Sequence, residues 1–270
     1  MIDYHMHTPL CRHASGSVEE YCQQALRRGL HEIGFSDHSP MPPWYDAQWR
    51  MKAEELPTYI DWVQQAQARY AGRLTIRMGL EADFHPGTEE YVADLLKSHP
   101  WDFVIGSVHY IANWGFDNPA FVRDFDTRDI DEVYRQYFRL LRQSAQSGLF
   151  DVIGHPELIK KFGHRPTRVL DAEMALTTRC FADCGIAIDV NTAGLRKPVA
   201  ERYPGDPFLH HLIAAKVGLC VGSDAHRPEE VGFMIAETLA HLAELGATTI
   251  RTFQGRTPSE RPIHELLKVA

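Results

Sequence analysis

Short apolar runs alternate with longer stretches of helical periodicity along almost the whole chain, and this alternation constrains the fold more than any other feature. The runs are rich in β-branched residues and have the length of strands. Strands that alternate with helices predict βα units and a parallel sheet. The seven candidate strands cover residues 2–5, 32–36, 74–81, 103–108, 151–154, 187–191 and 219–222.

Helical patterns follow most of these runs. The first begins after Ser17, which can cap the helix while the side chain of Glu20 reaches back to the same turn. Further helices are expected at about residues 54–71, 89–98, 129–147, 168–184, 207–215 and 228–245. The sequence has no internal repeat and no Gly/Ser linker, so we expect a single domain over residues 1–270.

A series of βα units either opens as a doubly wound sheet or closes as a barrel, and periodicity alone does not separate the two. His, Asp and Glu residues stand repeatedly at the carboxyl end of an apolar run. Barrel enzymes assemble their active sites at that end of the strands. We therefore favour an α/β barrel, whose closure would bring these side chains into one ring.

The formal net charge of -8 disfavours a nucleic-acid partner, because such partners are usually bound by a broad basic surface. A small phosphorylated substrate remains compatible with an acidic protein, since bound metal cations are often the largest local charges in a site. No apolar run is long enough to span a bilayer, and the first residues show no export signal. Five cysteines without disulfide spacing fit a reducing compartment, so we expect a cytoplasmic protein without a membrane partner.

The strongest local signal is a pair of histidines, His5 and His7, at the end of the first run. Side chains two apart in a strand share a face, so these imidazoles can chelate one divalent ion. Ligand-type side chains recur at the ends of later runs, where independent core histidines would have no reason to gather. The candidate metal ligands are His5, His7, His13, His38, Glu81, His109, His155, Asp224 and His226.

Nine candidates exceed the needs of one ion, which takes about four ligands. The sequence therefore predicts two or three divalent metals, with a carboxylate such as Glu81 able to bridge two of them. Closely spaced metals generate hydroxide near neutral pH and stabilise the attacking and leaving oxygens of an in-line displacement. Mixed nitrogen and oxygen sites of this kind accept Zn, Fe or Mn, and metal availability helps to decide between them.

The dispersed ligand set resembles that of the PHP (polymerase and histidinol phosphatase) family over nearly the whole chain. Within the family, residues 11–13, 106–110, 154–160 and 191–198 are most similar to the corresponding segments of monofunctional histidinol-phosphate phosphatases. The resemblance implies an α/β fold of the PHP type, a distorted (β/α)7 TIM-like barrel with three divalent metal ions. It also implies hydrolysis of L-histidinol phosphate in histidine biosynthesis, with a metal-bound hydroxide as the attacking group.

The resemblance further implies how the ligands are shared, and no ligand of the family pattern is missing. The first metal would be held by His5, His7, Glu81 and Asp224. The second would be held by His13, His38 and His226. The third would be held by Glu81, His109 and His155.

Arg196 is the first candidate for the substrate phosphate, because a planar guanidinium can bind two phosphate oxygens. Lys160 and Lys161 follow the fifth run closely, and either could assist from the same mouth. Ordinary solvated loop charges are the alternative for all three. Asp224 and His226 complete the predicted catalytic set through proton transfer, and the general acid is left unassigned.

Several neighbouring residues carry weaker expectations. Residues 41–51, rich in aromatics and proline, form either a lid over the substrate or a plug packed on the barrel rim. Asp37 and Asp83 are expected to orient histidines rather than to bind metal. Cys180 and Cys184, one helical turn apart, are expected to be buried structural thiols.

Two other functions remain open at this stage. One is a PHP-type phosphoesterase that acts on another small phosphate monoester or on nucleic-acid ends. The acidic chain and the lack of polymerase-sized flanking domains favour a small substrate. The other is a non-catalytic metal-binding or regulatory module. The sequence gives no indication of the oligomeric state.

Overall fold

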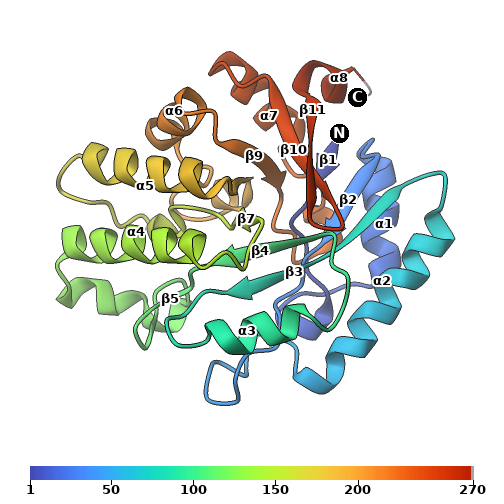
Figure 1. Ribbon diagram of the computed structural model, residues 1–270, viewed down its shortest axis with the longest axis horizontal. Coiled ribbons are helices and arrows are strands. Elements are labelled where there is room, and N and C mark those ends of the chain that lie inside the picture. Colours follow the sequence, from blue (N-terminus) through green and yellow to red (C-terminus); the bar gives the residue numbers. More distant parts are fainter. Residues whose placement is uncertain (269–270) are drawn as a thin grey trace.

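The computed structural model describes residues 1–268 and contains a parallel seven-stranded sheet that curls into a nearly closed barrel, with helices around it (Figure 1). The strand order β1-β2-β3-β4-β7-β8-β9 follows the chain, as expected for successive βα units. The strands span Ile2–Asp3, Glu32–Phe35, Thr75–Asp83, Phe103–Ser107, Val152–Ile153, Ala187–Asn191 and Gly218–Gly222. The distorted barrel predicted from the sequence is confirmed.

The helices lie outside the strands at nearly all of the predicted places. The capping box at Ser17 is present, because its backbone N–H donates to Glu20 Oε2 at 2.7 Å. The helix predicted at 228–245 is wrong at its start, since Gly232 and Met234 have φ angles of 72° and 54° that interrupt it. The α-helices are α1 Val18–Arg27, α2 Leu56–Tyr70, α3 Glu89–Leu96, α4 Ile130–Gln146, α5 Asp171–Cys184, α6 Asp206–Ala214, α7 Ile235–Glu244 and α8 Ile263–Leu267.

Backbone hydrogen bonds join the first and last strands of the barrel, and we call this junction the seam. Tyr4 N–H donates to Val221 O at 3.0 Å, and His7 N–H donates to Ala225 O at 2.9 Å. Ala225 N–H donates in return to His5 O at 3.2 Å. Because β1 is only two residues long, the seam continues past its end along the segment that carries the two predicted histidine ligands.

The amino-terminal end of the barrel is sealed by a hairpin that the sequence analysis did not predict, made of β10 (Thr249–Gln254) and β11 (Thr257–Pro262). Phe253 of this hairpin joins a separate buried cluster with Tyr4 and Phe103. The rings of Tyr4 and Phe103 stack with centroids 4.9 Å apart. A Cβ at Gly79 would come within 2.6 Å of the Phe103 ring, so a glycine is needed there.

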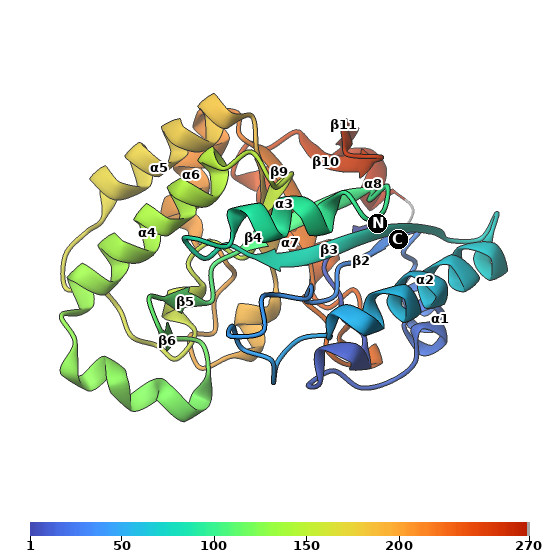
Figure 2. The same cartoon turned by 60° about the horizontal axis from the view of Figure 1, so that its bottom comes forward.

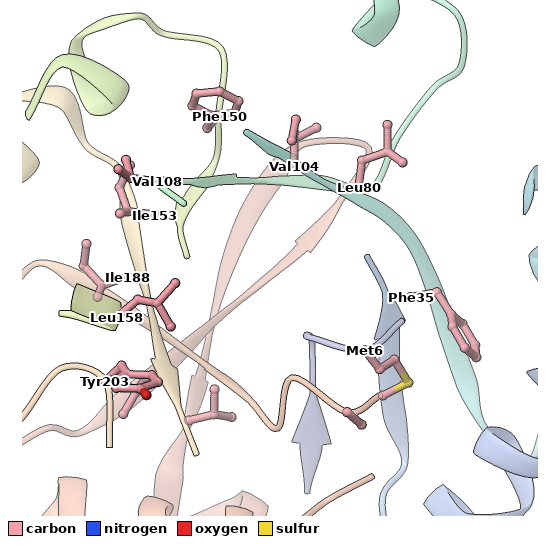
Figure 3. Close-up of a cluster of buried hydrophobic side chains, with 14 of the residues drawn as sticks. Met6, Phe35, Leu80, Val104, Val108, Phe150, Ile153, Leu158, Ile188 and Tyr203 are labelled. Carbon is pink, nitrogen blue, oxygen red and sulfur yellow. The ribbon is translucent and has the colours of Figure 1, made fainter. Parts of the chain in front are cut away.

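The main hydrophobic core lies between the strands and the surrounding helices (Figure 2). Strand side chains that face outward, such as Leu80 and Ile188, contact this layer rather than the barrel interior. In Figure 3, Ile153, Ile188 and Leu158 gather on one part of the sheet, close to Tyr203. This packing holds the strand ends in register and so fixes where their polar side chains meet.

Two smaller elements project from the carboxyl-terminal side of the barrel, and neither was predicted. The hairpin of β5 (Tyr110–Ile111) and β6 (Trp114–Gly115) follows β4, and the 3-10 helix Pro119–Thr127 continues from it (Figure 2). Short 3-10 turns also occur at Pro9–Cys11, Ala53–Glu55, Leu158–Lys160, Ala193–Arg196 and Pro228–Glu230. These connections supply the rim over the strand ends.

Three other expectations meet the structure differently. The prediction that Cys180 and Cys184 are buried is wrong, because Cys180 is only partly buried and Cys184 is exposed at the end of α5. Within residues 1–268, no helix has the length and hydropathy that a membrane crossing requires. A single domain over residues 1–270 stays a prediction, and residues 269 and 270 lie outside the described part.

Candidate metal centre

The nine predicted ligands converge at the carboxyl-terminal end of the barrel, although they come from six different strand ends and their loops. His5 and His7 are fully buried. A Cβ at Gly222 would lie 2.5 Å from the His5 Cβ, so the last strand needs a glycine beside the first histidine. His155 and Asp224 have positive φ angles of 27° and 52°, which turn the chain sharply after β7 and β9.

Glu81 lies at the centre of this cluster, with 1% of its surface exposed. Its Oε1 atom is 2.8 Å from His155 Nε2 and 3.7 Å from His109 Nε2. Its Oε2 atom is 3.0 Å from His38 Nδ1. His5 Nε2 and His7 Nε2 lie 3.4 and 3.5 Å from the same Oε2 atom. One carboxylate therefore faces five imidazoles, as a bridging ligand would.

Asp224 gives a second centre of negative charge at the seam. Its Oδ1 atom is 3.1 Å from His7 Nε2 and 3.7 Å from His5 Nε2. The ring of His226 stacks on that of His7 with a centroid separation of 4.1 Å, and His13 lies 4.5 Å from His226. The two histidines predicted from the first strand thus lie between the carboxylates of Glu81 and Asp224.

Several ligand-type atoms are buried without a hydrogen-bond partner in the described residues. They are His5 Nε2, His38 Nδ1, Glu81 Oε2 and His226 Nε2, since the short contact between His38 and Glu81 does not have the geometry of a hydrogen bond. An unpartnered buried polar atom is costly unless another group satisfies it. Sets such as His7, His38 and His226 have donor atoms within 4.8 Å of one another. Imidazole nitrogen and carboxylate oxygen suit divalent transition metals, so the residues present fit such ions.

Carboxylates outside the cluster hold the far nitrogens of its imidazoles. Asp83 Oδ1 is 3.0 Å from His109 Nδ1, and Asp37 Oδ1 is 3.4 Å from His7 Nδ1. Both aspartates therefore contact the histidines that they were expected to orient. His5 Nδ1 lies 2.8 Å from Asp189 Oδ2, a contact that the sequence analysis missed. The polar pair Asp189 and Asn191 on the sixth barrel strand was the signal that could have revealed it.

The charges of the cluster shift one another's ionisation. Burial lowers the pKa of His7, but hydrogen bonds to Asp224 and Asp37 outweigh it and raise that pKa to about 9. The same balance, with Asp83 as the main partner, raises the pKa of His109 to about 9. Burial opposes ionisation of Glu81, yet the surrounding imidazoles hold its pKa well below the usual range. Without metal, His7 and His109 therefore hold protons at neutral pH and Glu81 keeps its negative charge, whereas burial lowers the pKa values of His38 and His226 well below the usual range.

A two-lobed cavity opens onto the cluster. The basic lobe is lined by Lys161, Arg196, Lys197 and Arg227 together with most of the predicted ligands. The aromatic lobe is lined by Asp46, Trp49, Arg50, Tyr110 and Pro119. Both lobes share His13, His38, His109, Asp117 and Lys161, so they meet over the candidate metal centre.

The predicted phosphate-binding residues differ in position. Arg196 lines the basic lobe, where its Nη2 atom donates to Ser223 O at 2.8 Å. Lys161 lines both lobes, and its Nζ atom donates to the Asp117 carbonyl oxygen at 2.7 Å. Lys160 is not brought to the cavity, because its buried Nζ atom contacts Glu157 at 2.8 Å on another side of the turn. Lys197 and Arg227, which were not predicted from the sequence, do line the basic lobe.

Residues 41–51 both line the cavity and pack on the barrel rim, while a lid over the substrate stays a prediction. Tyr45 and Arg50 are buried and both donate to Asp83 Oδ2, at 2.5 and 3.0 Å, which anchors the segment on the rim. Trp44 and Trp49 keep 66% and 39% of their surface exposed. Trp49 also lines the aromatic lobe, with its ring edge toward His13. The segment is thus a cavity wall with a packed base.

Known proteins of similar sequence relate this chain to one family. The PHP domain family matches residues 3–193. A protein of Deinococcus radiodurans named "Probable histidinol-phosphatase" is 50% identical over 256 residues, which cover 95% of this chain and 97% of that protein. The histidinol-phosphatase of Bacillus subtilis is 30% identical, over 86% of this chain and 95% of that protein.

A solved structure shares the fold at lower identity. It is the histidinol phosphate phosphatase of Lactococcus lactis subsp. lactis in complex with zinc, L-histidinol and phosphate. The TM-score is 0.82 and the identity 22%, and the superposition covers 96% of this chain and 98% of that one. The overall fold therefore has a counterpart of known structure.

Proposed function

This chain belongs to the PHP family, and from that premise we propose that it hydrolyses L-histidinol phosphate to L-histidinol and phosphate in histidine biosynthesis. The observation that carries the proposal is the meeting of a lobe rich in cationic side chains with a cluster of unpartnered, ligand-type atoms. Near-complete coverage of relatives with this activity supports the same substrate.

The nine clustered residues are assigned to three divalent ions. His5, His7, Glu81 and Asp224 would hold the first, and the zinc found in the Lactococcus lactis protein supports zinc as one occupant. His13, His38 and His226 would hold the second. Glu81, His109 and His155 would hold the third. When bound, such ions supply Lewis-acid polarisation of phosphate oxygens and make water ionise near neutral pH.

The basic lobe neutralises the transferred phosphate. Arg196 presents a guanidinium whose Nε and Nη1 atoms have no hydrogen-bond partner among residues 1–268. Its nearest carboxylate is that of Glu230, 3.6 Å from Nε. A guanidinium placed in this way can bind two phosphate oxygens. Lys161, which lies where the lobes meet, is assigned to the oxygen between phosphorus and the leaving group.

Two residues at the seam are assigned to the attacking water. The pKa of Asp224 is held well below its usual range by His5 and His7, although burial opposes this, so Oδ1 accepts hydrogen bonds at neutral pH. The pKa of His226 is lowered well below its usual range, mainly by burial, so its Nε2 atom keeps a lone pair. Both groups are therefore deprotonated and available as metal ligands, and we assign to them the positioning of the attacking water beside the ions that they would hold.

We further propose a cytoplasmic location and a small phosphorylated molecule as the partner. All five cysteines are free, which suits a reducing compartment. The cavity is enclosed by the rim segments rather than by an extended basic surface, which favours a small ester over nucleic acid.

The test compares phosphate release from L-histidinol phosphate, 5′-nucleotides and single-stranded DNA by the purified protein, together with its metal content. We expect the highest kcat/KM with L-histidinol phosphate and bound divalent metal. Preferential cleavage of DNA or nucleotides would overturn the proposed substrate. Bound metal without release of phosphate from any ester would instead favour a non-catalytic metal-binding module.

A further inference from the structure

We propose that Asp46 determines which phosphate ester is accepted, by receiving a hydrogen bond from a cationic nitrogen of the leaving group. The inference rests on the proposed function, since L-histidinol carries an ammonium on the carbon beside its ester methylene and an imidazole one carbon further on. It adds a specificity residue that belongs neither to the metal centre nor to the basic lobe.

The two lobes differ in the charge that they offer to a substrate. Lys161, Arg196, Lys197 and Arg227 make the basic lobe suited to phosphate. The aromatic lobe offers two carboxylates and the rings of Trp49 and Tyr110, and its two cations, Arg50 and the shared Lys161, are already paired with Asp83 and Asp117. Because both lobes meet over the candidate metal centre, an ester cut there would have its phosphate in the basic lobe and its leaving group in the aromatic lobe. A leaving group with cationic nitrogens matches that second environment.

Asp46 and Asp117 are the carboxylates that line the aromatic lobe, and their partners differ. Asp117 Oδ2 is 3.2 Å from Lys161 Nζ, so its charge is already compensated. In the described part of the chain the Asp46 carboxylate has no ion-pair partner and accepts from the Tyr110 hydroxyl and, at 3.4 Å, from the Gln48 amide. Its negative charge is thus available to a ligand.

The surroundings hold Asp46 in a fixed place. Arg50 Nε donates to the Asp46 carbonyl oxygen at 2.9 Å, while its Nη2 atom is paired with Asp83. The Tyr110 hydroxyl fixes one carboxylate oxygen from the opposite side of the lobe. A carboxylate oriented by its neighbours loses little side-chain entropy when it binds a donor. Asp46 is therefore built as a recognition group rather than a free surface charge.

Trp49 completes the environment for a flat, nitrogen-bearing leaving group. Its ring lies edge-on to His13 with centroids 5.3 Å apart. A partly exposed indole on a cavity wall can pack on a heteroaromatic ring or attract a cation to its face. The acceptor at Asp46 and the indole of Trp49 together distinguish a histidinol-like leaving group from a simple alkyl or aryl group.

The experiment measures kcat/KM of the metal-loaded enzyme and its Asp46→Asn variant with L-histidinol phosphate and 3-phenylpropyl phosphate. The second ester has a similar length and ring but no nitrogen. Asparagine keeps the shape and can still accept from Tyr110, so the fold should not change. We expect kcat/KM to fall about 10- to 100-fold with L-histidinol phosphate, the range of one charged hydrogen bond. With 3-phenylpropyl phosphate it should change less than about threefold.

A binding measurement supplies a second readout. Calorimetric titration of the enzyme with L-histidinol in the presence of phosphate should show a weaker dissociation constant for Asp46→Asn by a similar factor. Asp94→Asn is the matched control. It removes an exposed carboxylate of α3 that lines neither lobe, and it should change neither quantity.

The outcomes separate the inference from the function on which it rests. Equal losses with both esters, or no loss with either, would overturn the role of Asp46. Failure of the unmodified enzyme to prefer L-histidinol phosphate over 3-phenylpropyl phosphate would overturn the proposed substrate itself. A selective loss with L-histidinol phosphate, together with weaker L-histidinol binding, supports both.

Discussion

The two ends of the barrel are built from the same strands but differ in whether their buried charged groups have partners within the protein. At the amino-terminal end, charges are paired: Arg77 Nε lies 2.8 Å from Glu32 Oε1, and Arg256 Nε lies 2.9 Å from Asp151 Oδ2. At the carboxyl-terminal end, buried atoms such as His5 Nε2 and Glu81 Oε2 have no hydrogen-bond partner within residues 1–268. These charges at one end are paired internally, whereas the other end leaves several ligand-type atoms without such a partner.

This difference separates stability from function within a single sheet. Satisfied pairs and the hairpin at the amino-terminal end hold the strands together, whereas unpartnered atoms at the other end lower stability until something binds them. Substitutions at the first end should therefore change the free energy of unfolding. Substitutions at the second end should change metal binding and turnover.

The largest effect is expected for Glu81→Ala. Loss of the carboxylate that faces five imidazoles should lower kcat/KM at least about 1000-fold and reduce bound metal, because the proposed bridging ligand would be removed. Thermal unfolding should remain cooperative. Metal analysis, phosphate release and circular dichroism measure these effects. Glu90→Ala, at an exposed position of α3, is the control; near-normal turnover of the Glu81 variant would refute the assignment.

Metal binding should depend steeply on pH. His7 and His109 have pKa values raised to about 9 in the metal-free centre, so below that pH they carry protons that an ion must displace. For each proton released, affinity should fall about tenfold per pH unit below 9. Zinc titration of the metal-free protein in weak buffer measures the release. Affinity that is constant between pH 7 and 9 would contradict the prediction.

The same shifts have a consequence for the stability of the metal-free protein. A folded-state pKa above the unfolded value stabilises the fold fully below the ordinary histidine pKa, and that contribution is lost as the pH rises through about 9. Its melting temperature should therefore decrease between about pH 6.5 and 9.

Two adjacent lysines offer a sharper test of the contrast. Lys161→Met should lower kcat/KM about 10- to 100-fold, because its ammonium lines the cavity, and should cost less stability than the Lys160 variant, because its pair with Asp117 is partly exposed. Lys160→Met should lower the free energy of unfolding by about 3 kcal/mol, since it leaves the buried Glu157 without its cation. Urea unfolding and steady-state kinetics on both variants separate these effects. The opposite pattern would reverse the two roles.

The smallest effect is expected at the sealed end. Arg256→Ala removes hydrogen bonds to Asp151 and to the Leu149 carbonyl oxygen, and should destabilise the protein by about 1–2 kcal/mol. Turnover should stay within about twofold of the unmodified enzyme. Lys97→Ala, which breaks an exposed pair on α3, is the stability control and should change little. A large loss of activity in the Arg256 variant would contradict the assignment of stability to the amino-terminal end and of function to the carboxyl-terminal end.

Much of the barrel was predictable because its information is local. Apolar runs bounded by polar residues fixed all seven strands, and Ser17 with Glu20 fixed the first helix start. The sealing hairpin is paired locally, between residues 249–254 and 257–262, and was missed although such pairing leaves a local signal. The register of the seam was not predictable, since it depends on contacts between residues more than 200 positions apart, such as Tyr4 with Val221. Periodicity carries no information about such pairings.

The candidate site shows the same division. Residues at strand ends could be placed in one ring from sequence order alone, and the nine predicted ligands do meet there. Neighbouring lysines could not be separated, because a single backbone turn decides that Lys161 faces the cavity while Lys160 faces Glu157. Asp189 escaped notice because it lies within a strand instead of at its end.

The seam also has a consequence for how the protein is made. Its backbone bonds join the segment of His5 and His7 to that of Asp224 and Ala225, so the first segment cannot reach its partners until more than 200 further residues have been synthesised. Loop closure over such a distance is slow compared with the formation of individual βα units. An ion that binds both segments would stabilise the closed barrel over open forms, so that the yield of folded enzyme would depend on the metal supply.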